Sequence, residues 1–342
     1  MKQPPLYVGM DLGTSSTLVY VEGSGIVYNE PSVVAYNIKE NRIVAIGNEA
    51  YKMIGKGNKS IRIVFPMKNG VIQDIRATRS QLNYIFSFKL KLMSRLKDSI
   101  MLLACPSMIT PLEKKALEQI ANSFGAKKVF VEEEVKMAAL GGGVDIYKPQ
   151  GSLVIDIGGG TTDIAVIASG DIVISKSTKV AGSFLNDEIV KYIRSKYGLE
   201  IGNKTSEQIK KEIGSAFRYS DEKNMSIYGR DIVSGLPRTA SISPAEIREV
   251  LIVQLSKILD CAVEVLEKTP PELAGDIFQK GMVICGGGAL IRGIDKYFTE
   301  LLKLPAIIGE QPLLAVVNGT KKFEYDIKTR IKELKQKTKM NY

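Results

Sequence analysis

Apolar residues along this chain occur in short runs with the length of buried strands and in longer stretches with helical spacing. In the first third, the short runs predict strands over residues 6–10, 17–21, 32–36 and 42–46. Farther along, the same reasoning predicts further elements: helices at 79–96, 111–124 and 134–140, and buried strands at 100–104 and 129–131. Strands and helices therefore share one sequence region, which predicts an α/β protein.

The second half of the chain repeats this order of elements. The pattern predicts a β-rich patch at 224–233, strands at 153–155, 164–167 and 282–284, and helices at 184–197, 206–216 and 244–266. Hairpins followed by alternating strands and helices thus occur twice. This repetition predicts two similar α/β halves with a cleft between them.

Two polar turns hold equivalent places in these halves, each directly after a predicted buried strand. The first is Asp11-Leu12-Gly13-Thr14-Ser15, and the second is Asp156-Ile157-Gly158-Gly159-Gly160-Thr161. Glycine lets the backbone approach an anion and direct N–H groups toward it, and hydroxyl groups add donors. A strand-end aspartate can hold a divalent cation, directly or through water. Ordinary glycine-rich hairpins would explain either turn alone, but the duplication favours a two-lobed clamp on one nucleotide.

A third glycine-rich turn follows the predicted strand at 282–284. Gly286, Gly287 and Gly288 would let a flat ring or a phosphate rest on bare backbone at a helix N-terminus. A plain glycine turn between strand and helix is the alternative. The chain has no P-loop sequence, so this turn and the two hairpins are its candidates for nucleotide binding.

Charged residues supply the remaining candidates for chemistry. One acid of Glu132-Glu133-Glu134 could orient or deprotonate an attacking water, or all of them could simply favour the start of the next helix. Glu207 and Lys210 share a helix face and could reach a ribose, although a solvated salt-bridge pair is the alternative.

The amino-acid composition limits the kinds of catalytic group that are available and indicates the cellular compartment. The chain has 342 residues, of which 44% are hydrophobic, enough for two or more lobes. The sequence contains no run of 18 apolar residues, so it predicts no membrane span. The N-terminus does not resemble a signal peptide. The 3 cysteines form no CxxC pair, which indicates a reducing compartment and no zinc site. Because histidine is absent, catalysis would depend on carboxylates, hydroxyls, amides and a metal ion.

Positive charge is concentrated at the C-terminal end. Residues 321–342 contain 8 basic and 3 acidic residues, a net +5 of the total +10. Such a tail suits an acidic surface, and without a nucleic-acid motif the better prediction is anionic lipid and not nucleic acid. Alternatively, Phe323, Ile327, Ile331 and Leu334 have helical spacing and predict a docked terminal helix with only a short basic end.

The motifs together resemble the actin, Hsp70 and sugar-kinase ATPase superfamily, and within it the bacterial actin family MreB. The resemblance rests on the Asp11 and Asp156 turns and the Gly286 triplet, and it runs from about residue 7 to residue 318. Further stretches that look like MreB are residues 29–35, 66–72, 207–216, 235–237 and 271–274. Small-molecule kinases of the superfamily remain the alternative. An Hsp70-like chaperone would need a substrate-binding domain.

The resemblance implies an actin-like fold with two RNase-H-like lobes, a nucleotide cleft between them, and a small insertion subdomain on each lobe. Subdomain IA would comprise residues 1–32, 66–145 and 314–342, IB 33–65, IIA 146–181 and 246–313, and IIB 182–245.

The resemblance also implies roles for single residues. Asp11 and Asp156 would hold Mg²⁺ through water, and Glu134 would position the attacking water with the help of Thr161. Glu207 and Lys210 would touch the ribose, and the glycines of the third turn the adenosine. Gly13, Thr14, Ser15, Gly158, Gly159, Gly160 and Thr161 would cradle the phosphates. Val135 departs from the proline usual in the family, so the loop that presents Glu134 is expected to be less rigid.

The function that follows from the resemblance is a slow Mg-dependent ATPase that polymerises, with paired protofilaments, and controls cell shape. It would lie in the cytoplasm at the inner face of the membrane, with other cytoskeletal or cell-shape proteins as further partners. The segment Lys89–Lys97, where cations interleave with apolar residues, stands where relatives have a membrane-touching loop. This segment and the basic tail are the predicted contacts with anionic lipid.

Overall fold

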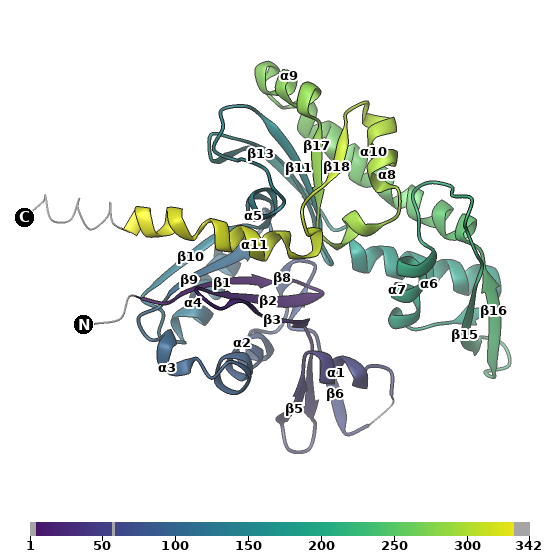
Figure 1. Ribbon diagram of the computed structural model, residues 1–342. Coiled ribbons are helices and arrows are strands. Elements are labelled where there is room, and N and C mark those ends of the chain that lie inside the picture. Colours follow the sequence, from purple (N-terminus) through teal and green to yellow (C-terminus); the bar gives the residue numbers. More distant parts are fainter. Residues whose placement is uncertain (1–4, 57–58, 332–342) are drawn as a thin grey trace, which may run out of the picture. The chain divides into compact units, whose positions relative to one another are not determined.

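The computed structural model describes residues 5–56 and 59–331, which form two compact units (Figure 1). Of the described residues, the first unit comprises 5–54, 59–146 and 309–331, and the second comprises 55–56 and 147–308. Each unit is built around a five-stranded mixed sheet. The predicted duplication of an α/β half is therefore confirmed.

The sheet of the first unit has the strand order β10-β9-β1-β2-β3. The strands β1, β2 and β3 form an antiparallel meander, and β9 and β10 extend the sheet parallel to β1. Their bounds are β1 (Tyr7–Leu12), β2 (Ser16–Val21), β3 (Gly25–Pro31), β9 (Ile100–Cys105) and β10 (Lys128–Glu133). Because β1, β9 and β10 run parallel, their carboxyl ends lie at the same edge of the sheet.

Smaller elements and helices complete the first unit. A three-stranded sheet of β4 (Val34–Asn37), β5 (Arg42–Ile46) and β6 (Ile61–Val64) packs with α1 (Asn48–Met53), and β7 (Met67–Lys68) pairs with β8 (Val71–Ile72). The helices are α2 (Ile75–Tyr84), the π-helix η1 (Ile85–Lys89), α3 (Met93–Leu96), α4 (Pro111–Asn122), α5 (Glu134–Gly141), the 3₁₀-helix η3 (Pro312–Leu314) and α11 (Ala315–Lys322).

The second unit repeats the arrangement with the strand order β13-β12-β11-β17-β18. Its sheet contains β11 (Ser152–Ile157), β12 (Thr162–Ala168), β13 (Asp171–Thr178), β17 (Met282–Cys285) and β18 (Ala306–Ile308). Its helices are α6 (Gly182–Tyr197), α7 (Asn203–Ile213), α8 (Pro244–Glu267), α9 (Pro271–Lys280) and α10 (Ile294–Leu302). The sheet and helices enclose an apolar core of leucine, isoleucine and valine side chains.

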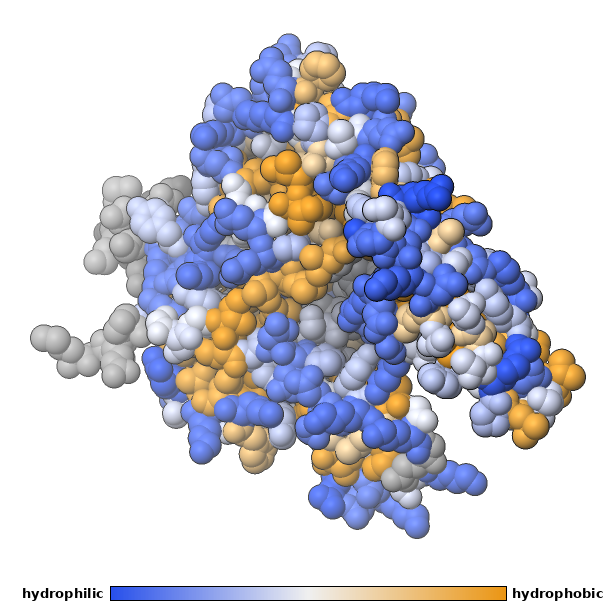
Figure 2. Space-filling model, turned by 45° about the vertical axis from the view of Figure 1, so that its right-hand side comes forward, coloured by the Kyte–Doolittle hydropathy of each residue, from blue (hydrophilic) through white to orange (hydrophobic). Residues whose placement is uncertain are grey.

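A second, smaller sheet in this unit ends in an apolar hairpin. It consists of β14 (Leu199–Glu200), β15 (Met225–Asp231) and β16 (Pro237–Ile242). At the β15–β16 turn, the side chains of Ile232, Val233 and Leu236 are 49%, 92% and 65% exposed. Figure 2 shows this apolar surface at the end of the hairpin, at the lower right.

In the first unit, α5 and α11 pack with their backbones in close contact (Figure 1). A Cβ on Gly141 would lie 1.8 Å from the carbonyl oxygen of Ala315, and one on Gly319 would lie 1.9 Å from that of Met137. Only glycine fits at these two positions. The contact fixes α5, the helix that begins at Glu134.

The sequence predicted the central strands and long helices of both units but missed several short strands and helices, and its helix at 79–96 differs from the structure. The Asp74 side chain accepts a hydrogen bond from the Ala77 amide at 2.9 Å, so α2 begins earlier, at Ile75. Helical bonding then ends after η1, where Lys91 has a left-handed φ of 51°. This break lets Leu96 pack fully buried in the core. The strands β3 and β13 were also missed, although each contains three consecutive apolar residues, because polar residues make up the rest of each strand.

The predicted docking of the C-terminal segment is confirmed as far as the structure describes it. Residues 324–331 are helical, and Phe323 and Ile327 are buried. Leu334 and the basic end from Lys335 lie outside the described residues. Among the helices of residues 5–56 and 59–331, none is long and apolar enough to cross a membrane.

Candidate functional site

The first polar turn joins β1 to β2 at the edge where the parallel strands end. Asp11 is in register with Leu18 on β2 and with Ala104 on β9. Desolvation raises the pKa of Asp11 to about 7. Within the described residues, the amides of Thr14 and Ser15 donate no hydrogen bond to another protein group, so both can bind an anion.

The Thr14 hydroxyl oxygen already accepts one hydrogen bond. The Gly70 amide, in the β7–β8 turn, donates to Thr14 Oγ1 at 3.0 Å. The hydroxyl oxygen therefore acts as acceptor, and its proton can be donated to a ligand. This supports the predicted role of Thr14 as a phosphate contact.

Glu134 directly follows β10, which lies two strands from β1 in the same sheet. Ala104 on β9 is in register with both Asp11 and Glu132, so Asp11 and the end of β10 lie about 10 Å apart across two strand spacings. Glu134 is the first residue of α5 and is half-buried. The structure therefore places a carboxylate near the strand-end aspartate of its own unit.

The two preceding glutamates have other surroundings. Glu132 forms ion pairs with Arg330 at 3.0 Å and with Lys136 at 3.9 Å. Glu133 has one carboxylate oxygen that is buried and accepts no hydrogen bond among the described residues. Of the three acids that the sequence offered, Glu132 is held in ion pairs at the side of the α5–β10 junction, and Glu134 keeps the helix-start position predicted for it.

The second polar turn joins β11 to β12 and is tighter than the first. The Gly158 amide donates to the Thr161 carbonyl at 2.9 Å and closes the turn. The amides of Gly159 and Gly160 donate to no protein group within the described part of the chain. Asp156 is 4% exposed and is in register with Cys285 on β17. This unit therefore repeats the combination of a strand-end aspartate and available amides.

The start of α6 supports the second turn, a feature that sequence reasoning missed. The amides of Gly182 and Ser183 donate to the carbonyls of Gly158 and Gly159 at 3.0 and 2.8 Å. The Thr162 hydroxyl donates to the Val180 carbonyl at 2.7 Å. These contacts join residues some twenty positions apart, and no local sequence signal reports them.

The third glycine turn lies beside the second one, but it does not begin an α-helix. Gly286 has a φ of 78°, and a Cβ on it would lie 2.4 Å from the Ile157 carbonyl oxygen. Gly287 opens η2 (Gly287–Leu290), a 3₁₀-helix of 4 residues. The predicted helix N-terminus is therefore wrong, because a single 3₁₀ turn has no aligned set of peptide dipoles. A Cβ on Gly288 would lie 2.2 Å from the Ile157 side chain, so these glycines also allow close packing.

Lys210 and Glu207 separate into two environments. The Lys210 ammonium donates to the Gly182 carbonyl at 2.8 Å, and burial lowers the pKa of Lys210 to about 8. The Glu207 carboxylate lies 2.6 Å from Lys211. The structure thus brings Lys210, on α7, to the start of α6 next to the second turn, whereas Glu207, also on α7, pairs with Lys211.

The donor groups of each unit fit a magnesium nucleotide chemically. Asp11 and Asp156 offer the oxygen ligands that Mg²⁺ prefers, and available amides, the Thr14 hydroxyl and Lys210 offer donors for phosphate or ribose oxygens. Such a pair of sheets with duplicated phosphate-type hairpins defines the actin-like class of proteins.

Solved structures confirm this class. The structure named "MamK double helical filament" matches with a TM-score of 0.79 over 94% of this chain and 98% of that chain at 21% identity, which shows the actin-like fold. MreB5 of Spiroplasma citri bound to AMPPNP matches with a TM-score of 0.94 at 54% identity, over 97% of this chain and 99% of that one. The same MreB5 bound to ADP matches with a TM-score of 0.92.

Sequence comparison gives the family. The profile of the MreB/Mbl protein family matches residues 6–332. The cell shape-determining protein Mbl of Bacillus subtilis is 44% identical over 313 residues, which cover 92% of this chain and 94% of Mbl. The cell shape-determining protein MreB of Escherichia coli is 40% identical and covers 91% of both chains. The chain therefore belongs to the MreB/Mbl family and is a bacterial actin, and the small-molecule kinase alternative is not favoured.

Proposed function

We propose that this chain binds ATP with Mg²⁺, hydrolyses it slowly, and assembles into filaments that determine cell shape. The observation that carries the proposal is the pair of hairpins, each with a strand-end aspartate and amides available to an anion. The relatives add support, because MreB5 was solved with AMPPNP and with ADP and the curated relatives are cell shape-determining proteins.

Each predicted site residue has a role in this proposal. Asp11 and Asp156 hold Mg²⁺ through water, and the bound ion neutralises charge on the phosphates. Thr14, Ser15, Gly159 and Gly160 donate their amides to phosphate oxygens, with Gly13, Gly158 and Thr161 shaping the turns. Glu134 orients the attacking water with the help of Thr161. Lys210 and Glu207 contact the ribose, and Gly286, Gly287 and Gly288 lie against the adenosine.

The four-part division of the actin fold is also proposed for this chain. Subdomains IA and IB correspond to the first unit, and IIA and IIB to the second. The small sheet β4–β6 would belong to IB, and β14–β16 to IIB. Filaments would consist of paired protofilaments at the inner face of the membrane.

One experiment tests this function directly. Purified protein is incubated with Mg-ATP, then sedimented, imaged by electron microscopy and assayed for phosphate release. Filaments together with slow phosphate release are the expected result. Rapid turnover that depends on a small-molecule acceptor, with no polymer at any protein concentration, would overturn the proposal in favour of a kinase.

The apolar hairpin end is the surface that we expect to contact a second copy of the chain. Val233→Asp places a charge on the most exposed apolar side chain of this turn, and burying that charge in a subunit contact is costly. We expect the critical concentration for assembly to rise at least tenfold, measured by sedimentation, with nucleotide affinity unchanged. Val253→Asp is the matched control, because Val253 is an exposed valine on α8. Equal assembly of both variants and wild type would remove the hairpin from the contact.

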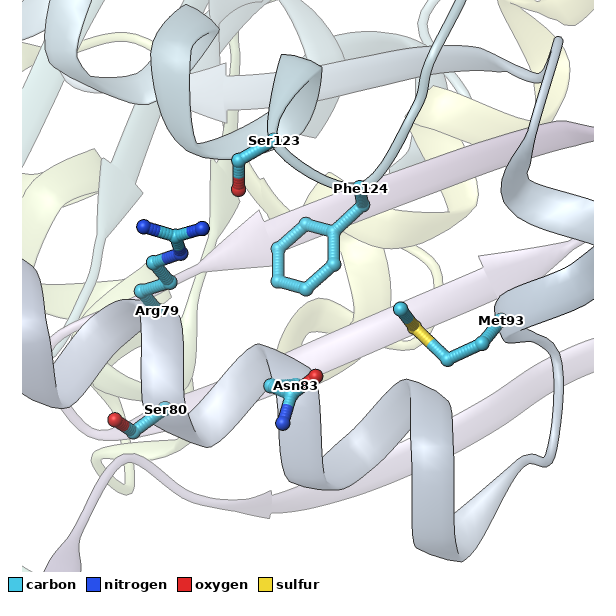
Figure 3. A pocket seen from close by; sticks show the side chains of 6 residues that line it. All are labelled: Arg79, Ser80, Asn83, Met93, Ser123 and Phe124. Atoms are coloured by element: carbon cyan, nitrogen blue, oxygen red, sulfur yellow. The ribbon is translucent and has the colours of Figure 1, made fainter.

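Only some of the apolar side chains in and beside the proposed membrane segment are exposed. Leu96 is buried and Leu90 and Leu92 are half-buried, whereas Met93 and the neighbouring Phe88 are exposed. Met93 also lines a surface pocket of about 400 Å³ with Arg79, Ser80, Asn83, Ser123 and Phe124 (Figure 3). The apolar contact would therefore come from Phe88 and Met93, flanked by the cations of Lys89–Lys97.

Removing three of these cations should weaken binding to anionic membranes. Lys91, Arg95 and Lys97 are exposed, and each cation near such a surface contributes about 1 kcal/mol, so their replacement by Gln predicts a roughly 100-fold weaker partition coefficient at low salt. Cosedimentation with anionic and neutral vesicles measures it. The control replaces Lys268, Lys280 and Lys303, which are exposed on the second unit. Unchanged binding of the first triple variant would contradict this membrane contact.

A further inference from the structure

A buried chain of side-chain hydrogen bonds lies behind the first polar turn. The Ser32 hydroxyl donates to the Gly13 carbonyl at 2.7 Å, and Ser32 Oγ lies 2.8 Å from Thr17 Oγ1. The Gln81 amide, on α2, donates to Thr17 Oγ1 at 3.2 Å. Ser32, Thr17 and Gln81 are only 1%, 1% and 2% exposed. The chain thus links the core-facing side of α2 to the turn that carries Thr14 and Ser15.

The protons in this chain can have only one order. The Gly13 carbonyl has no proton, so the Ser32 hydroxyl must donate to it and can only accept from Thr17. The Thr17 hydroxyl, having given its proton to Ser32, must accept from the Gln81 amide nitrogen. Each donor therefore depends on the one behind it, and Gln81 is the terminal donor. Such polarised chains strengthen each member.

Holding the Gly13 carbonyl determines where the next amide points. The described chain has no cis peptide bond, and in a trans peptide the C=O and the following N–H point in opposite directions. When Ser32 holds the Gly13 carbonyl toward the core, the Thr14 N–H points away from the core. The Ser32 amide also donates to the Ser15 carbonyl at 3.0 Å, which orients the Ser16 N–H in the same way.

The second turn reaches the same result without side chains. The amides of Gly182 and Ser183 hold the carbonyls of Gly158 and Gly159. The Gly159 and Gly160 amides are then turned outward by the same peptide geometry. The first turn therefore depends on removable hydroxyl and amide groups, whereas the second depends on backbone.

We propose that Ser32, Thr17 and Gln81 are positioning residues that aim the amides of the first turn at nucleotide phosphate. The inference rests on the proposed nucleotide binding and adds the residues that set the turn. Without Gln81, the Thr17 hydroxyl loses the donor behind it, and the polarised chain that holds the Gly13 carbonyl is weakened. The Thr14 amide would lose its fixed direction while the packing of α2 stayed intact.

Isosteric variants separate positioning from folding. Thr17→Val and Gln81→Met remove the polar groups with little change of volume, and Thr17→Ser keeps the hydroxyl. Thr269→Val is the control in the second unit, because Thr269 is a buried threonine whose hydroxyl donates to the Val265 carbonyl at 2.7 Å and has no part in either turn. Calorimetry or a fluorescent nucleotide measures the Kd for Mg-ATP, and competition measures adenosine, which has no phosphate. Melting curves without nucleotide report folding.

The expected result is a loss confined to phosphate recognition. Thr17→Val and Gln81→Met should bind Mg-ATP about tenfold more weakly, the effect of one net hydrogen bond, with adenosine binding unchanged and Thr17→Ser close to wild type. Mg-ATP binding equal to wild type in both variants, or an equal loss for adenosine, would overturn the inference. Wild-type protein that binds no Mg-ATP would instead overturn the proposed function together with it.

Discussion

Glu134→Gln is expected to reduce phosphate release by two to four orders of magnitude while nucleotide binding and filament assembly persist. A carboxylate that orients and deprotonates water contributes about 10²–10⁴-fold to rate, and an amide of the same shape cannot accept the proton. Glu134 begins α5, and α5 is held by backbone contact with α11, so the substitution leaves the helix in place. Phosphate release measured beside sedimentation distinguishes chemistry from assembly.

The neighbouring acids provide the matched controls. Glu132→Gln removes a partner of Arg330 and Lys136 and should change stability slightly, with phosphate release within a factor of three of wild type. Glu133→Gln makes the same chemical change one residue before Glu134. A loss of phosphate release in Glu133→Gln but not in Glu134→Gln would show that Glu133 orients the water, and it would contradict the proposed role of Glu134.

Asp11→Asn is expected to stabilise the nucleotide-free protein at pH 8 and to weaken Mg-ATP binding by about 10–100-fold. Desolvation raises the pKa of Asp11 to about 7, well above the ordinary value near 4. The fold therefore prefers the protonated carboxyl, and its stabilising contribution is complete below about pH 4 and is lost as pH rises to about 7. An asparagine has no such loss, so its melting temperature should exceed that of wild type at pH 8 and not at pH 4.

The affinity for Mg-ATP should rise with pH, whereas the contribution of Asp11 to the stability of the nucleotide-free protein falls with pH. The ion needs the ionised carboxylate, so the affinity of wild type for Mg-ATP should fall as pH drops below about 7, whereas Asp11→Asn should bind weakly at every pH. Melting curves and nucleotide titrations between pH 4 and 8 test both statements. The control is Asp260→Asn, an exposed position on α8. A wild-type affinity for Mg-ATP that does not change between pH 5 and 8 would contradict a role for Asp11 in holding the ion.

Local signals in the sequence were sufficient for much of the fold. The strand at 42–46 has the bounds of β5, and the helix predicted from Pro111 begins there because Thr110 and Glu113 form a reciprocal cap. Both polar turns lie between paired strands as predicted. These elements depend on side-chain periodicity and on neighbours within four positions, which the sequence states directly.

Features that depend on contacts between distant residues were not predictable in the same way. The break after η1 follows from packing Leu96 into the core against an otherwise continuous helical pattern. Gly286 looked like part of a helix N-terminus, but its surroundings are the Ile157 backbone. The support that Ser32 and Gly182 give to the two turns joins segments about 20 residues apart.

By itself, the sequence determined the class of this protein and its candidate chemistry: two α/β halves, duplicated turns rich in glycine and hydroxyl groups, and strand-end aspartates. The backbone freedom of glycine, the donors of hydroxyl groups and the charge of carboxylates are the same in any fold. The order of these residues along the chain was therefore enough to predict the class and the candidate chemistry. Only the tertiary structure decided which groups are held, turned or desolvated. The direction of the Thr14 amide, the raised pKa of Asp11 and the pairing of Lys210 with the Gly182 carbonyl all depend on neighbours that folding brings together.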